Sequence, residues 1–178
     1  MKSTPKNRIL YKQHENLKLE CYIDVDYVGA LTERRLTSGY YTLLGGNLVT
    51  WRSKKQNVVS RSSAEAKFIS IAFGISELLW MKNVLGDLRI KWDKPMRLYC
   101  NNKSVIGITH NPMQYYRTKH MEEVDRHFIK EKLDSRLICT PHVPTGGQLA
   151  NILVKGVQNP LFGSILDKLE IKDLLYPA

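Results

Sequence analysis

The sequence predicts an α/β domain in which helices pack on the faces of a mixed β-sheet. Three observations lead to this fold class. Apolar and polar residues alternate at the start of Leu17–Asp24, and two further strand-like segments, Ser38–Leu44 and Leu48–Arg52, flank a pair of glycines. A long segment with helical periodicity follows at Ala64–Leu85. The rest of the chain alternates short apolar strands with shorter helical segments.

The first half of the domain is predicted as strands followed by a long helix. Gly45 and Gly46 form a turn signal, so the two segments beside them are expected to pair as a hairpin. In the long helix, apolar residues recur at a spacing that places them on one face. Ser62 and Glu65 have the spacing of a capping box at its start, and Gly86 is expected to end it.

The second half is predicted as short strands and helices that complete the sheet. The expected strands are Met96–Cys100 and Leu137–Val143, and the expected helices are Lys103–Thr109, Glu122–Leu133, Leu149–Val154 and Asn159–Leu169. This pattern gives one domain over residues 17–170. Residues 1–16 are expected to be a basic lead-in and residues 171–178 a tail.

Composition indicates a folded, strongly basic protein. Apolar residues make up 43% of the 178 residues, which is typical of a globular domain. Lysine and arginine exceed the acidic residues by ten, and the isoelectric point is near 9.5. Such a charge favours a polyanionic partner, although a solvated basic surface without any nucleic-acid role fits the charge equally well.

The cysteines and the hydropathy favour an intracellular protein, in the cytoplasm or the nucleus. The three cysteines, Cys21, Cys100 and Cys139, are widely spaced and form no CxxC pair, so they signal neither a zinc site nor a disulfide framework. The N-terminus lacks the apolar region of a secretory signal. No apolar run approaches the roughly 20 residues needed to cross a bilayer, so no membrane partner is expected.

Strand ends and helix starts are the places where sites form in open α/β sheets. Here these places are Asp24, the helix start at Ser62–Phe68, Asn101, and the segment Gln148–Asn151. Only Asp24 and Glu65 supply carboxylates there, and the sequence favours a capping role for Glu65. Spacing alone therefore does not predict a metal-dependent active site.

Longer runs of residues identify a family resemblance. The run YIDVDYVGALTERRLTSGYYTLLGGNLVTWRSKKQNVVSRSSAEAKFISIA resembles the ribonuclease H (RNase H) module of copia-type LTR retrotransposon Pol polyproteins, in particular those of plants. RLYCNNKSVIGITHNP, RTKHMEEVDRHFIKEKLDS and GGQLANILVKG continue the match in order. The resemblance implies an RNase H-like fold with a mixed five-stranded sheet. It also implies an Mg²⁺-dependent activity on the RNA of RNA–DNA hybrids, and a reverse transcriptase domain in the parent polyprotein.

The same resemblance implies that the acidic site is degenerate. The family's first strand ends in Asp-x-Asp, and Asp24 keeps the metal-binding position. The long helix of the family begins Ser-Ser-x-Glu-Ala-Glu, and Lys67 stands where the second Glu is catalytic. Asn101 replaces the Asp of Cys-Asp-Asn, and Asn151 replaces the Asp of Gln-Leu-Ala-Asp. The net charge of the four positions thus falls from four negative charges to zero.

This loss predicts that Mg²⁺ is not held stably and that the enzyme is inactive or very feeble. Asn offers a carbonyl oxygen without charge, and a lysine ammonium near Asp24 repels a cation. Asp24 is nevertheless expected at the site position rather than at a surface turn. Lys67 is left with two interpretations: a phosphate contact, or a helix-start lysine whose stem lies over Ile71.

Basic side chains in two segments are predicted to contact a nucleic-acid backbone, with Tyr115 and Tyr116 near for stacking. These side chains are Arg52, Lys54, Lys55, Arg117, Lys119 and His120. Trp51 and Trp80 are expected in the core. No small-molecule ligand is expected.

By descent, the predicted function is cleavage of RNA in RNA–DNA hybrids, impaired in this chain. The alternatives are a nucleic-acid-binding or interaction module domesticated from the element, without catalysis, and a decayed transposon fragment.

Overall fold

The computed structural model describes residues 7–26, 35–59, 63–110 and 123–173, and its centre is a mixed five-stranded sheet. The strand order is β4-β3-β2-β5-β6. β3 runs antiparallel to both of its neighbours, whereas β5 is parallel to β2 and to β6. The predicted fold class is confirmed. The strands are β2 (Leu19–Asp26), β3 (Arg35–Leu44), β4 (Asn47–Val59), β5 (Met96–Tyr99) and β6 (Ile138–Cys139).

A two-residue turn joins β3 and β4, as the sequence predicted. Gly45 and Gly46 have φ angles of 58° and 82°, the left-handed conformation that glycine adopts without steric cost. Two consecutive positive φ angles match the right-handed twist of the paired strands. The register runs from Leu44 opposite Asn47 at the turn to Arg35 opposite Val59 at the far end.

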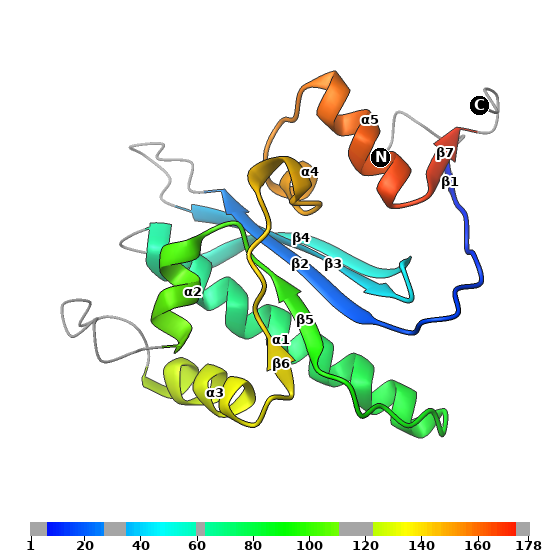
Figure 1. Ribbon diagram of the computed structural model, residues 1–178. Coiled ribbons are helices and arrows are strands. Elements are labelled where there is room, and N and C mark those ends of the chain that lie inside the picture. The colour runs from blue at the N-terminus through cyan, green and yellow to red at the C-terminus, as the bar shows by residue number, and fades with distance from the viewer. Residues whose placement is uncertain (1–6, 27–34, 60–62, 111–122, 174–178) are drawn as a thin grey trace.

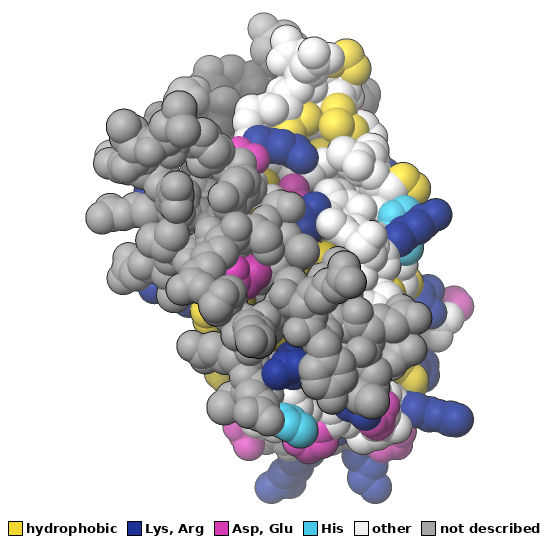
Figure 2. Space-filling view, turned by 90° about the vertical axis from the view of Figure 1, so that its left-hand side faces the viewer, with side chains coloured by type: hydrophobic (Ala, Val, Ile, Leu, Met, Phe, Trp, Pro, Cys, Tyr) yellow, Lys and Arg dark blue, Asp and Glu magenta, His cyan; other side chains and the backbone are white. Residues whose placement is uncertain are grey.

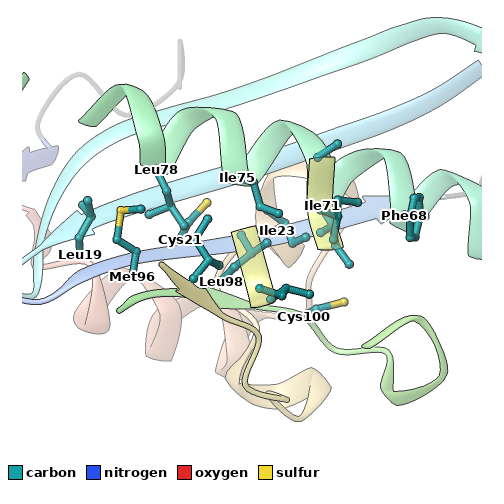
Figure 3. Close-up of a cluster of buried hydrophobic side chains, with 14 of the residues drawn as sticks. Leu19, Cys21, Ile23, Phe68, Ile71, Ile75, Leu78, Met96, Leu98 and Cys100 are labelled. Carbon is teal, nitrogen blue, oxygen red and sulfur yellow. The ribbon is translucent and has the colours of Figure 1, made fainter. Parts of the chain in front are cut away.

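The long helix α1 (Ser63–Asp87) covers one face of the sheet. Figure 3 shows its apolar side chains interleaved with those of β2 and β5. Ile71, Ile75 and Leu78 are fully buried, and they pack in one cluster with Cys21 and Leu98. Burial of this stripe, at about 25 cal/mol per Å² of apolar surface, is what holds the helix on the sheet.

The end of α1 differs from the sequence prediction. Gly86 lies inside the last turn rather than ending the helix, and Arg89 takes the left-handed conformation, with φ 61°. The amides of Arg89 and Ile90 donate to the carbonyls of Gly86 and Leu85, which closes the helix end. Ser62, the proposed cap at the other end, lies outside the described residues.

The remaining helices are divided between the two faces of the sheet (Figure 1). α2 and α3 pack beside α1, and their buried side chains join its cluster. α4 and α5 lie on the opposite face, where a second cluster includes Tyr41, Leu48 and Ile165. The helices are α2 (Lys103–His110), α3 (Glu123–Asp134), α4 (Asn151–Val154) and α5 (Asn159–Lys168), with a short 3-10 turn at Thr145–Gly147 before α4.

The structure adds an element that the sequence did not predict. β1 (Asn7–Ile9) and β7 (Ile171–Asp173) pair antiparallel as a separate two-stranded sheet, so segments expected as lead-in and tail meet. The strand expected at Leu137–Val143 is also shorter than predicted. It is reduced to β6 and a single bridge between Cys100 and His142.

By length and composition, Glu65–Asp87 within α1 could cross a membrane, which the sequence analysis did not anticipate. Half of an 18-residue stretch of this helix is buried inside the domain, where the helix packs on the sheet. Such burial is typical of the core helix of an α/β domain.

Candidate active site

The site is built around Asp24, at the carboxyl end of β2. Along this strand Ile23 and Val25 point toward α1, and Val25 contacts Ala66 there. Because side chains alternate along a strand, Asp24 points away from that face. Only 3% of its surface is exposed. A buried carboxylate is costly unless polar groups surround it, so its neighbours define the chemistry of the site.

Two of the predicted positions reach Asp24 through hydrogen bonds. Lys67, in the first turns of α1, donates from Nζ to Oδ1 of Asn101 over 3.1 Å. The Asn101 amide donates in turn from Nδ2 to Oδ1 of Asp24 over 3.4 Å. Three parts of the chain therefore meet at one point: the end of β2, the start of α1, and Asn101, two residues after the end of β5. The side-chain amide of Asn101 thus bridges the ammonium of Lys67 and the carboxylate of Asp24.

A second lysine, which the sequence analysis missed, approaches Asp24 from the other side. Lys155 follows α4, and its Nζ lies 3.6 Å from Oδ2 of Asp24. A helical spacing could not have signalled this lysine, because Lys155 lies after α4 with an extended backbone, at φ −144° and ψ 159°. Counting Asp24, Lys67 and Lys155, the site carries one net positive charge.

Asn151, the fourth predicted position, is buried next to the site without bonding to Asp24. It opens α4, and its Nδ2 donates to the carbonyl of Thr145 over 2.8 Å. Within the described part of the chain, its Oδ1 has no hydrogen-bond partner. The structure thus joins Asp24, Lys67 and Asn101 directly, while Asn151 belongs to the helix that brings Lys155 to the same place.

Gln148 fixes that helix to the sheet. Its fully buried side chain donates from Nε2 to the carbonyl of Ile23 over 3.0 Å and to that of Tyr99 over 3.4 Å. Its Oε1 accepts from the backbone amide of Ala150. One side chain therefore connects β2, the end of β5 and the start of α4. These are the three elements that bring Asp24, Asn101 and Lys155 together.

The donor set does not fit a pair of Mg²⁺ ions. Magnesium prefers oxygen ligands and usually binds through carboxylates. Asp24 supplies one carboxylate, whose Oδ2 already faces an ammonium, and the oxygen of Asn101 already accepts from Lys67. Among the residues that the structure describes, no group of three or more His, Cys, Asp or Glu side chains could hold a metal ion. The two ammoniums would also repel a divalent cation.

The basic residues of β4 that were predicted to contact nucleic acid do not all lie on one face of the strand. Arg52 and Lys54 lie on one face, and Lys55 lies on the other. Arg52 and Lys54 line a cavity of about 230 Å³ beside α1, together with Tyr40, Phe73, Glu77 and two serines. Glu77 accepts hydrogen bonds from the hydroxyls of Tyr40 and Thr50, over 2.9 and 2.8 Å.

The other predicted contacts, Arg117, Lys119 and His120, lie outside the described residues, as do Tyr115 and Tyr116. Figure 2 shows one face of the molecule, where lysine and arginine side chains lie scattered among acidic ones over the described part. The expected core positions of Trp51 and Trp80 are wrong: these side chains are 43% and 52% exposed. Trp51 lies on a strand near the sheet edge, and Trp80 lies on the outer face of α1.

The chain is similar in sequence to plant transposon proteins. It is 34% identical over 168 residues to the retrovirus-related Pol polyprotein from transposon RE1 of Arabidopsis thaliana, and 35% identical over the same length to that from transposon RE2. Each alignment covers 94% of this chain but only 11% and 12% of those polyproteins. No protein-family profile matches the chain.

Solved structures share the fold at low sequence identity. The crystal structure of LC11-RNase H1 in complex with an RNA/DNA hybrid matches with a TM-score of 0.56 and 15% identity, over 77% of this chain and 94% of that one. The foamy viral protease-reverse transcriptase in complex with an RNA/DNA hybrid matches with a TM-score of 0.56 and 14% identity, over 83% of this chain and 21% of that one.

Proposed function

We propose that this chain, the RNase H-like module of a copia-type retrotransposon Pol polyprotein, binds an RNA–DNA hybrid. We also propose that it has lost the ability to cleave the RNA strand efficiently. The observation that carries the proposal is the bonding of Asp24. Its Oδ1 accepts a hydrogen bond from Asn101, which accepts one from Lys67, while its Oδ2 is ion-paired with Lys155 and has no hydrogen-bond partner among the described residues. The groups that would hold metal ions are thus replaced by groups that compensate the charge of a single carboxylate.

Loss of the carboxylates removes the basis for hydrolysis. Cleavage of a phosphodiester by two metals needs ions that activate the attacking water and stabilise the leaving oxygen. Asp24 is the single carboxylate among the four positions, and Lys67 supplies a positive charge where the family has a negative one. The residues present therefore do not fit that chemistry, and no catalytic step can be assigned to them.

Nucleic-acid binding is supported by charge rather than by the acidic site. The chain carries ten more basic than acidic residues. Three exposed basic side chains on β4, Arg52, Lys54 and Lys55, are available to contact phosphates. Two structural relatives with the same fold were solved with an RNA/DNA hybrid. We therefore take the hybrid as the first ligand to test.

The parent context of the domain is part of the same proposal. The chain spans about a ninth of the length of its curated relatives, which are Pol polyproteins, and one structural relative is a protease-reverse transcriptase. We infer that this domain works beside a reverse transcriptase domain of its own polyprotein. Such a role, with nucleic acid as the ligand, would be exercised inside the cell, in the cytoplasm or the nucleus.

Reversion of the three substituted positions tests the proposal. We expect the natural chain to leave a labelled RNA–DNA hybrid intact in Mg²⁺ or Mn²⁺. The triple variant K67E, N101D and N151D is expected to cleave it, because it restores three carboxylates around Asp24. Adding D24N to the triple variant should abolish that cleavage again. Robust cutting by the natural chain, lost in D24N alone, would overturn the proposal.

A thermal measurement separates a silent site from a damaged fold. In the triple variant three additional carboxylates repel one another beside Asp24, so its melting temperature should fall in EDTA and rise again in Mg²⁺. The natural chain should melt at the same temperature in both solutions. A triple variant that folds and gains no stability from Mg²⁺ would mean that the scaffold no longer forms a metal site.

A further inference from the structure

We infer that Lys67 and Lys155 form a phosphate-binding site above Asp24 that works without a metal ion. This inference rests on the proposed function and deepens it by naming the groups that contact the nucleic-acid backbone at the degenerate site. It assigns a role to Lys155, and it selects phosphate contact over simple packing as the role of Lys67.

The first observation that supports the inference is the difference in solvent exposure between Lys155 and Asp24. The Asp24 side chain is 2% exposed, whereas that of Lys155 is 38% exposed. The carboxylate therefore lies beneath and the ammonium above it, toward solvent. Nζ of Lys155 lies 3.6 Å from Oδ2 of Asp24, and no hydrogen bond joins the two groups. Asp24 therefore does not saturate the three N–H donors of this ammonium, and a ligand that approaches from solvent can accept hydrogen bonds from them.

Lys67 is held in a comparable way from the opposite side. Its Nζ donates to Oδ1 of Asn101, whose Nδ2 donates to Oδ1 of Asp24. One carboxylate thus keeps two lysines near it: Lys67 through a hydrogen-bonded amide, and Lys155 through an ion pair of 3.6 Å. Side chains that are already oriented lose less conformational entropy when a ligand binds.

The charge and the donor types select the ligand. Two ammoniums over one carboxylate leave one positive charge in excess, so the site favours an anion. A phosphate oxygen accepts charge-assisted hydrogen bonds from lysine and suits a point-like cation. A backbone phosphate of the bound strand is the anion that a basic RNase H-like domain would bring to this position. Because the ammoniums supply the positive charge, contact at this site requires no divalent metal.

Salt-dependent binding of a hybrid provides the test. A short fluorescent RNA–DNA hybrid is titrated with the natural chain in EDTA, over a series of salt concentrations. K67M and K155M should each weaken binding about tenfold at low salt. Each should also reduce the slope of log K against log salt by about 0.9, the value for one lost phosphate contact on B-form DNA. K155R retains the charge and should bind like the natural chain.

Two further variants complete the design. Lys94 is exposed just before β5 begins, at the end of the sheet opposite to the site, so K94M should leave the slope unchanged. D24N removes the carboxylate but keeps both ammoniums, so binding in EDTA should persist in this variant. Metal-mediated binding would give the reverse: weaker binding in both D24N and EDTA. Circular dichroism of each variant checks that it is folded.

The outcomes distinguish the inference from the proposed function. If the natural chain binds no hybrid at any salt concentration, the proposed function fails. If it binds and K67M and K155M match K94M in affinity and slope, the inference alone fails. Binding that disappears in EDTA would also overturn the inference.

Discussion

Gly74 lies on the side of α1 that packs against the sheet. A Cβ atom built there would approach Cδ1 of Leu98 to 2.6 Å and Cγ2 of Ile23 to 2.8 Å. Both side chains are buried in the main core cluster, so neither has room to move away. Gly86, in the same helix, has nothing within 4 Å of such an atom. Glycine is therefore needed for close packing at position 74, but it has no packing role at position 86.

A matched pair of alanine substitutions tests this difference. We expect G74A to destabilise the domain by about 1–3 kcal/mol, because the added methyl overpacks the core. G86A should stabilise it by about 0.5–1 kcal/mol, since alanine is the better helix former. Urea unfolding of the two variants beside the natural chain measures both changes. Equal effects of the two substitutions would contradict the packing argument.

At the scale of elements, the position of α4 against the sheet determines what surrounds Asp24. Gln148 makes this connection through the carbonyls of Ile23 and Tyr99 and the amide of Ala150. α4 also passes close to β3, where a Cβ at Gly39 would meet Cβ of Leu153 at 2.6 Å. In addition, Oγ of Ser53 on β4 donates to the carbonyl of Leu153 over 2.7 Å. A short helix is thereby held by specific polar contacts as well as by apolar burial.

Removal of the Gln148 side chain should loosen this attachment. We expect Q148A to cost about 2–4 kcal/mol, because it creates a cavity and removes the partners of buried backbone groups. Q158A is the control: Gln158 is exposed before α5 and makes no side-chain cap bond there. Chemical denaturation gives the stabilities, and hydrogen exchange of the α4 amides reports the local effect. A Q148A variant as stable as Q158A would refute the role given to Gln148.

At the scale of the whole molecule, tyrosines that lie in or against the two apolar clusters resist ionisation. Burial raises the pKa of Tyr41 to about 12. The pKa of Tyr40 is also raised to about 12, mainly by burial and secondly by its hydrogen bond to Glu77. The unfolded chain loses these protons near pH 10. Above that pH the unfolded state releases protons that the folded state keeps, so the domain loses stability.

Alkaline pH should therefore destabilise the domain over a defined range. The contribution of these tyrosines is fully present below about pH 10 and is lost as the pH rises from there through about 12. Urea unfolding at a series of pH values measures the slope. Y41F should reduce this slope, because phenylalanine has no proton to lose. A Y41F variant with the slope of the natural chain would show that Tyr41 does not contribute to it.

Much of the fold could be predicted from the sequence, because its signals are local. The Gly45-Gly46 turn and the helical spacing of residues such as Ile71 and Ile75 depend on backbone geometry over a few residues. The failures concern contacts between distant segments. The pairing of Ile9 with Ile171 and the exposure of Trp51 and Trp80 depend on which surfaces other elements cover. Secondary-structure propensities and local sequence patterns do not show which surfaces other elements cover.

The candidate site divides in the same way. The sequence by itself determined that Lys67, Asn101 and Asn151 stand where the resemblance implies carboxylates, since residue identity at an aligned position needs no coordinates. Only the tertiary structure decided that Lys67 reaches Asp24 through Asn101, that Lys155 reaches it directly, and that Asn151 turns to Thr145 instead. The physical reason is that side-chain partners are selected by burial and distance once the sheet and α4 have packed together.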